Sequence, residues 1–208
     1  MRLEVAMTRR LIHAVDDFYP NPGRVRRIAL ETPFVEHKEL GMWATQSYHP
    51  KGVRALLEKQ FRICISKWDQ ISDPFNGAFY SAFSKGTRAE PVRIHYDHPA
   101  SWFVVIIYMT PDAPYDAGTS LWQHRETGLI AGPTEKDAER LGISVKTLDA
   151  LIQRDCAKPY RWREVDRIGN IYNRAVMFPG KMLHSATRHF GGNPSNGRIY
   201  QGFQFPLI

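Results

Sequence analysis

Residues 94–110, IHYDHPASWFVVIIYMT, set a histidine and an aspartate two positions apart before a run of eight apolar residues. The run, residues 102–109, is rich in β-branched and aromatic side chains and is far shorter than the roughly 20 residues that a membrane-spanning helix needs. It predicts a buried strand, and we expect VRIHYD before it to be a strand as well. Because side chains two apart in a strand share a face, His95 and Asp97 would point together while Tyr96 points away. An imidazole and a carboxylate then meet on one face.

From Ala78 onward the chain shows the same pattern, in which short apolar or aromatic runs are separated by turn residues. It continues with GAFYSAFSKG, GTSLWQHR, NRAVMFPG, MLHSATRHF and RIYQGFQF in addition to the stretch above. Short β-branched and aromatic runs bounded by Gly, Pro, Asn or Ser predict strands. We therefore expect a β-rich core over residues 78–208.

Residues 127–168 interrupt that pattern. Within them, TEKDAERLG and SVKTLDALIQRDC carry apolar residues at helical spacing, and each begins with a Thr or Ser that can cap a helix. The sequence therefore predicts a mainly helical insertion, at about residues 127–168, inside the β-rich core.

The first 77 residues are expected to form an αβ support for this core. The segment RRLIHAVDDFYPNPGRVRRIALET predicts a short strand to about Val15, then a helix with Asn21 as N-cap and Pro22 at its first position. A second helix is predicted within residues 50–68, where apolar residues recur at helical spacing.

The composition of residues 1–208 is typical of one globular domain, with 43% hydrophobic and 12% aromatic residues. The formal net charge is +7, but the basic residues are scattered, which indicates a solvated surface rather than a nucleic-acid-binding tail. Two cysteines, Cys64 and Cys156, are too few for a disulfide framework or a cysteine zinc site. With neither a signal-peptide pattern nor a membrane span, the sequence predicts a cytoplasmic protein.

The His-x-Asp tripeptide is weak evidence when taken alone, because 8 His and 11 Asp in 208 residues give about 0.4 occurrences by chance. Its context comes from residues 178–205, FPGKMLHSATRHFGGNPSNGRIYQGFQF, which predict a turn, a short strand ending in His184, and a last strand carrying Arg198. A second histidine from another strand would complete a two-histidine, one-carboxylate triad. Such a triad suits ferrous iron and leaves positions open for substrate and oxygen.

In this order of residues the chain resembles the iron(II)- and 2-oxoglutarate-dependent dioxygenase superfamily. The resemblance covers roughly residues 78–208 and implies an α+β fold with a double-stranded β-helix core, also called a jelly-roll or cupin-like core, braced by N-terminal helices. It implies that His95, Asp97 and His184 bind Fe(II) and are the catalytic centre. It also implies that Arg198, fourteen positions after His184, binds the far carboxylate of the cosubstrate 2-oxoglutarate. The planar guanidinium can hold a carboxylate through two parallel hydrogen bonds.

Tyr108 and Tyr200 are candidate hydroxyl donors to the cosubstrate, although tyrosines in a core or an interface with a hydrogen-bonded tip are equally common. Tyr200 stands where many members of the superfamily have a serine two positions after the arginine. The insertion also places 89 positions between His95 and His184, which departs from the prolyl hydroxylase pattern.

Three further segments, YHPKGVRA, GTSLWQHRETGL and NRAVMFPGKMLHSA, resemble a bacterial branch of this superfamily that is often associated with natural-product gene clusters. This implies a reaction of molecular oxygen with a small-molecule, amino-acid-derived or carrier-bound substrate, by default hydroxylation of a C–H bond. Retention of Asp97 disfavours halogenation, because related halogenases replace this carboxylate with a small residue. Desaturation and cyclisation use the same ligands, so the sequence leaves the outcome open, together with the substrate and the oligomeric state.

A second pair, His124 and Glu126, could also hold iron by its chemistry. Its position argues against this role, because the first motif of the resembled fold precedes most of the barrel, whereas few strands follow His124. We expect His124, Arg125 and Trp122 to line the substrate pocket instead; the alternatives are a solvated loop and a tryptophan that fills the barrel.

Two other functions fit part of the sequence. The first is a noncatalytic β-barrel that binds a ligand or a protein, in which His95 and Asp97 make ordinary hydrogen bonds. The second is nucleic-acid demethylation, which the sequence disfavours: such demethylases usually carry a further arginine shortly after the first in the last strand, and this chain continues RIYQGFQF.

Overall fold

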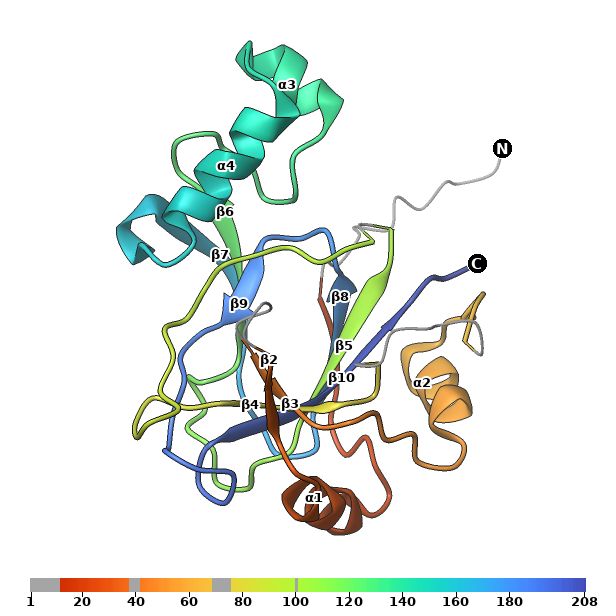
Figure 1. The fold of residues 1–208 in the computed structure, drawn as a ribbon. Helices are drawn as coiled ribbons and strands as arrows, with labels where there is room; N and C mark the ends of the chain where they lie inside the picture. Colours follow the sequence, from red (N-terminus) through yellow and green to blue (C-terminus); the bar gives the residue numbers. More distant parts are fainter. Residues whose placement is uncertain (1–11, 38–41, 69–75, 100) are drawn as a thin grey trace, which may run out of the picture.

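The computed structural model of this chain describes residues 12–37, 42–68, 76–99 and 101–208 (Figure 1). The chain is α+β, and its named strands pair antiparallel in two sheets, a large one ordered β1-β8-β5-β10-β4-β3-β2 and a small one ordered β7-β6-β9. The strands are β1 (His13–Val15), β2 (Val35–His37), β3 (Met42–Ala44), β4 (Phe79–Ala82), β5 (Phe103–Tyr108), β6 (Thr119–His124), β7 (Trp162–Ile168), β8 (Ala175–Pro179), β9 (His184–Ala186) and β10 (Arg198–Phe205). The helices are α1 (Pro22–Glu31), α2 (Val53–Phe61), α3 (Glu135–Leu141), α4 (Val145–Asp155) and the short 3₁₀ helix η1 (Pro159–Arg161).

The predicted N-terminal elements are present. The strand predicted to end near Val15 is β1, and α1 starts as expected, with the Asn21 side chain accepting a hydrogen bond from the Arg24 N–H at 3.1 Å and Pro22 at the first position. Helix α2 lies within the predicted segment and buries the face that carries Leu57. These local signals were sufficient because caps and helical spacing act over a few residues.

One face of the large sheet packs against α1 and α2. Val105 and Ile107 of β5 are fully buried there, in the same apolar cluster as Ala29 of α1 and Leu57 of α2. The two helices therefore cover one side of the sheet, as the predicted N-terminal bracing requires.

The other face of the large sheet packs against the small sheet. Val104 and Ile106 of β5 contact a second cluster that includes Phe178 of β8 and Leu121 of β6. Alternate side chains of β5 therefore point to the helices and to the small sheet. This double burial explains why residues 102–109 are apolar throughout rather than alternating with polar residues.

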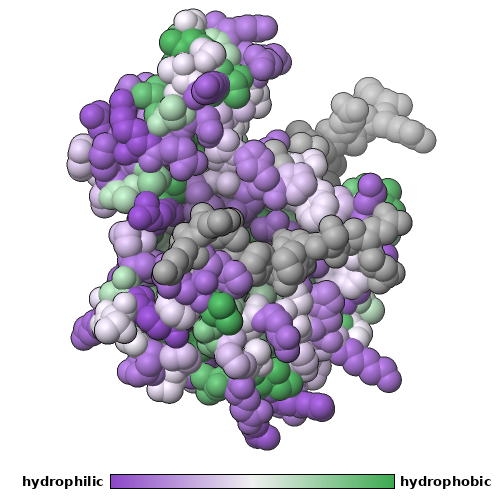
Figure 2. Space-filling view, in the orientation of Figure 1, coloured by the Kyte–Doolittle hydropathy of each residue, from purple (hydrophilic) through white to green (hydrophobic). Residues whose placement is uncertain are grey.

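Helices α3 and α4 stand at one end of the molecule, beyond β6 and β7 (Figure 1). Leu148 and Ile152 of α4 are fully buried in a third apolar cluster, together with Trp162 at the start of β7. Hydrophilic residues predominate on the face of the molecule that Figure 2 shows, with apolar residues in small groups. Within the described ranges, every helix is too short or too polar to cross a bilayer.

The structure corrects two expectations about secondary structure. VRIHYD is not a strand: His95 makes only an isolated bridge with His184, and prolines at 91 and 99 limit pairing on either side. The segment 127–168 is not helical to its end, because its last seven residues form β7, which pairs with β6. The two short strands β2 and β3 also extend the large sheet from within the predicted N-terminal support. That the chain is a single domain stays a prediction.

Candidate metal centre

His95, Asp97 and His184 come together at β9, an edge strand of the small sheet, where His95 forms an isolated bridge with His184. Nε2 of His184 lies 3.5 Å from Oδ2 of Asp97, and Nε2 of His95 lies 3.7 Å from Oδ1 of the same carboxylate. One ligand atom from each residue lies within 4.8 Å of the other two. With metal–ligand bonds of about 2 Å, three donors at these separations can surround a single cation.

Backbone hydrogen bonds bring these residues together although 89 positions separate the two histidines. The His95 N–H donates to the His184 carbonyl at 3.0 Å, and the His184 N–H donates back at 2.8 Å. The Asp97 N–H donates to the carbonyl of Gly180 at 2.8 Å. A Cβ at position 180 would lie 3.4 Å from Cβ of Asp97 and 3.1 Å from the carbonyl oxygen of Trp102, so this approach favours glycine.

Both histidine rings are held by their Nδ1 atoms. Nδ1 of His95 lies 3.0 Å from the carbonyl of Arg93, and Nδ1 of His184 lies 2.8 Å from the carbonyl of Met182. A carbonyl only accepts hydrogen bonds, so each Nδ1 carries a proton, and in the neutral imidazole each Nε2 then keeps its lone pair for a metal. The two free nitrogens are the ones that face Asp97.

The three side chains are buried to different extents, which affects the charge of His184 and the route by which solvent reaches the site. The side chain of His184 is 5% exposed, that of Asp97 is 21% exposed and that of His95 is 50% exposed. Burial, opposed by the Asp97 carboxylate, lowers the pKa of His184 to about 4. His184 is therefore neutral at pH 7, which is the form that binds a metal, and the site opens to solvent beside His95.

Arg198, the first residue of β10, is a buried cation, and the described residues form no ion pair with it. It is 3% exposed, its Nη2 lies 3.5 Å from the Gly118 carbonyl, and its Nε has no hydrogen-bond partner. The guanidinium carbon lies 4.5 Å from the ring centroid of Tyr200 and 5.8 Å from that of Tyr108. Aromatic faces stabilise the positive charge but leave its hydrogen-bonding capacity for an anion.

Tyr108 and Tyr200 lie opposite each other on β5 and β10. The Tyr108 hydroxyl is 2.7 Å from Oγ1 of Thr119 on the small sheet. The Tyr200 ring stacks on Tyr80, with centroids 5.0 Å apart and planes 9° apart. Burial raises the pKa of both phenols and the Arg198 charge opposes the rise, while the Asp97 charge adds to it for Tyr200. Tyr200 therefore lies within electrostatic reach of both Arg198 and the metal-binding candidates.

The structure does not bring Trp122, His124 and Arg125 to the triad. Leu121 pairs directly with His184, so the next residue of β6, Trp122, faces the other side of the small sheet, where it packs in the third apolar cluster. His124 is fully buried, with Nδ1 3.0 Å from Oγ1 of Thr127, and Nε of Arg125 donates to a backbone carbonyl. Their role in substrate binding stays a prediction.

His124 belongs to a second group of possible ligands, with Glu126 and Asp155. Its Nε2 lies 3.3 Å from Oδ2 of Asp155, but the same carboxylate also accepts hydrogen bonds from Arg154 at 2.6 Å and from Lys158 at 3.0 Å. These cations lower the pKa of Asp155 and occupy its oxygens, which disfavours a metal there. The sequence did not reveal Asp155 as the partner of His124, because the pairing depends on how α4 folds back on β6.

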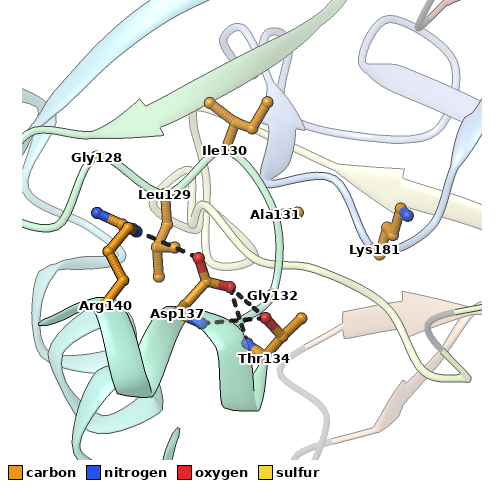
Figure 3. A pocket seen from close by; sticks show the side chains of 9 residues that line it. All are labelled: Gly128, Leu129, Ile130, Ala131, Gly132, Thr134, Asp137, Arg140 and Lys181. Atoms are coloured by element: carbon orange, nitrogen blue, oxygen red, sulfur yellow. Dashed lines mark hydrogen bonds and ion pairs between the residues drawn. The ribbon is translucent and has the colours of Figure 1, made fainter. Parts of the chain in front are cut away.

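A surface hollow of about 210 Å³ also borders the helical insertion (Figure 3). It lies between α3 and residues 128–132, with Arg140 on one side and Lys181 on the other. Asp137 bonds to Thr134 and Arg140 across its base, so the acidic group in the hollow is already partnered. None of the three triad residues lines this hollow.

Comparison with solved structures defines the class of fold. HygX from Streptomyces hygroscopicus with nickel and 2-oxoglutarate bound matches with a TM-score of 0.50 and 8% identity, over 94% of this chain and 83% of that chain. HygX with nickel, 2-oxoglutarate and hygromycin B bound gives 0.50 and 10%, over 94% and 83%, and HygX with iron bound gives 0.50 and 9%, over 94% and 82%. The predicted resemblance to iron(II)- and 2-oxoglutarate-dependent enzymes is therefore confirmed at the level of the fold.

The family follows from a match along the sequence. A model of DUF6445, a family of unknown function, matches residues 2–201, so this chain belongs to that family. No curated protein matches the chain.

Proposed function

We propose that this protein is an iron(II)- and 2-oxoglutarate-dependent oxygenase that hydroxylates a C–H bond of a small molecule. The observation that carries the proposal is the convergence of His95, Asp97 and His184, with both free Nε2 atoms directed at one carboxylate. Two imidazoles and a carboxylate are the donor set that non-haem iron(II) oxygenases use. We propose further that the two facing sheets form a double-stranded β-helix.

Arg198 would hold 2-oxoglutarate. Its buried guanidinium needs an anion, its Nε is without a partner, and Tyr200 and Tyr108 flank it. A carboxylate seated there would accept two parallel hydrogen bonds from the guanidinium. The presence of 2-oxoglutarate in HygX, which shares this fold, supports the assignment.

Iron(II) and 2-oxoglutarate, when bound, would let O₂ act as the oxidant: one oxygen atom would enter the substrate C–H bond and the other would enter succinate as 2-oxoglutarate loses CO₂. The chain's own residues hold and orient the reactants. The carbonyls behind His95 and His184 fix the ligating nitrogens, and burial keeps His184 neutral. The apolar ring of Phe178, 4.7 Å from His184, excludes water behind the site.

The substrate is proposed to approach from the His95 side, where the triad is most exposed. A small molecule is the class that the fold favours, since HygX is also known with hygromycin B bound. An amino-acid-derived or carrier-bound substrate fits the same approach, because an exposed mouth can admit one arm of a larger molecule.

The test is to mix the protein with iron(II) and 2-oxoglutarate without oxygen and to record the visible spectrum. The wild type should show the weak charge-transfer absorption of an iron–2-oxoglutarate complex. His184→Ala should lose it, because a ligand is gone, and Arg198→Ala should need a higher 2-oxoglutarate concentration to develop it. A wild type that retains no iron and shows no absorption would favour the noncatalytic barrel instead.

A further inference from the structure

The segment that carries His95 and Asp97 lies outside the named strands, so the sheets do not hold it along its length. On the side of the triad it is held by the reciprocal bridge to His184 and by the bond from Asp97 to the Gly180 carbonyl. On its other side the segment contacts the helical insertion.

The insertion contacts the segment that carries His95 and Asp97 at two positions, on the side away from the triad. Ile94, next to His95, is buried in the third apolar cluster with Leu148 and Ile152 of α4, and its N–H donates to the carbonyl of Cys156 at 2.9 Å. Cys156 is the C-cap of α4, directly after its last residue. The first ligand therefore follows directly after a residue that is anchored to this helix.

The second contact is made by Tyr96, which lies between His95 and Asp97 in the sequence and points away from the triad. Its hydroxyl donates to Oδ1 of Asp149 on α4 at 2.8 Å. Its ring lies against residue 132, where a Cβ would come within 2.6 Å of Cδ2 of Tyr96. The absence of a side chain on Gly132 therefore lets the ring pack closely, with its hydroxyl aimed at α4.

We propose that the helical insertion is a positioning device for the metal centre, in which the hydrogen bond from Tyr96 to Asp149 sets the placement of His95 and Asp97. The inference rests on the proposed metal-binding role of the triad. Residues 94 and 96 contact α4, whereas His95 and Asp97 point to the triad. Without the Tyr96 contact, both ligands would keep their backbone bonds to residues 184 and 180 but lose a support between them. Contacts that orient metal ligands from outside typically change metal affinity by about 10–100-fold when they are removed.

Titration with cobalt(II), a spectroscopic probe for such a site, tests this on the full chain in two variants. Tyr96→Phe removes only the hydroxyl, and Asp149→Ala removes the acceptor while placing a better helix former in α4. Each should weaken cobalt(II) binding by about tenfold or more and alter the visible cobalt spectrum, with Asp149→Ala melting no lower than wild type. The double variant should bind as each single variant does, because both remove one interaction.

Ser144→Ala is the matched control. Ser144 caps α4 by accepting a hydrogen bond from the Thr147 N–H at 3.1 Å, and its loss weakens the helix while leaving the Tyr96 contact in place. This variant should bind cobalt(II) like wild type although it unfolds at a lower temperature. Wild-type affinity and spectrum in folded Tyr96→Phe and Asp149→Ala would overturn the inference and leave the proposed function standing. A wild type that binds no cobalt(II) would overturn both.

Discussion

Which nitrogen of each histidine is left free determines whether the three candidate ligands can bind one metal ion. Each histidine donates its Nδ1 proton to a carbonyl two residues earlier, so both Nε2 atoms are free, and both face Asp97. The carboxylate supplies the only negative charge of this donor set. Its backbone N–H, bonded to the Gly180 carbonyl, does not depend on that charge.

Asp97→Asn should therefore keep the fold and lose the metal. The amide has the size of the carboxylate, but it lacks the charge that offsets a divalent cation. We expect iron(II) affinity, measured by anaerobic titration, to fall more than about 100-fold, since removal of supporting contacts alone costs about 10–100-fold. Asp166→Asn, at an exposed position of β7, should leave the affinity unchanged. Equal affinity in Asp97→Asn and wild type would remove Asp97 from the site.

Gly202 is the residue that lets the rings behind Arg198 stack. A Cβ at this position would lie 2.7 Å from Cε2 of Tyr80, whose ring stacks on Tyr200, which in turn lies under Arg198. Nothing in the sequence marked Tyr80 or Gly202, because their contact arises only when β4 and β10 pair.

Gly202→Ala should weaken 2-oxoglutarate binding selectively. The added methyl displaces Tyr80 and with it the support of the guanidinium, and we expect about a tenfold loss of affinity by calorimetry, which corresponds to about 1.4 kcal/mol. Metal affinity should stay at the wild-type value. Gly23→Ala is the control, because a Cβ there meets only Oδ1 of Asn21, at 4.0 Å. An unchanged 2-oxoglutarate affinity in folded Gly202→Ala would mean that the stack does not position Arg198.

Among the helices and strands, the sequence predicted those that are specified by residues close together in the chain. The cap at Asn21 and the apolar run of β5 specify α1 and a doubly buried strand within a few residues. The three-residue strands β2 and β3 exist only through pairing with each other and with β4, so no local pattern marks them. The face of Trp122 was likewise set by a distant event, the pairing of Leu121 with His184.

The buried carboxylate of Asp155 anchors the end of α4 to β6 and should make stability depend on pH. Hydrogen bonds from Arg154, then Lys158 and His124, lower the pKa of Asp155 below its ordinary 3.8, against the effect of burial. A lowered pKa in the folded state stabilises the fold above the unfolded-state pKa, and this contribution is lost as the pH falls through the folded-state value.

Asp155→Asn should therefore lower the unfolding temperature most at neutral pH. Removing one partner of a buried charge network costs about 3–5 kcal/mol, here moderated because the cationic partners are partly exposed. In thermal unfolding experiments, the gap between wild type and variant should be full at pH 7 and begin to shrink below about pH 4, where Asp155 of the unfolded chain takes up a proton while the folded carboxylate still keeps its charge. A gap that stays constant down to pH 3 would contradict the assigned role.

The three triad residues come from distant parts of the chain, and the complete fold brings them together. His95 precedes β5 and His184 begins β9, and the insertion with α3 and α4 lies between them in the sequence (Figure 1). The sequence indicated the order of these three candidate ligands, but their separations depend on both sheets and the insertion together. An unfolded chain therefore offers no comparable site, and metal binding should be coupled to the folded state.

Metal should consequently raise the unfolding temperature of the wild type, and the rise should grow with the metal concentration. A ligand that binds only the folded state at 100 times its Kd adds about 2.7 kcal/mol, and in a chain of this size each kcal/mol is worth about 2–4 °C. We expect cobalt(II) to raise the melting temperature by about 5–10 °C and a chelator to reverse the rise. Asp97→Asn should show almost none of it, since the three donors act as one site. A rise of the same size in wild type and Asp97→Asn would place the bound cobalt(II) elsewhere on the molecule and separate the metal from the triad.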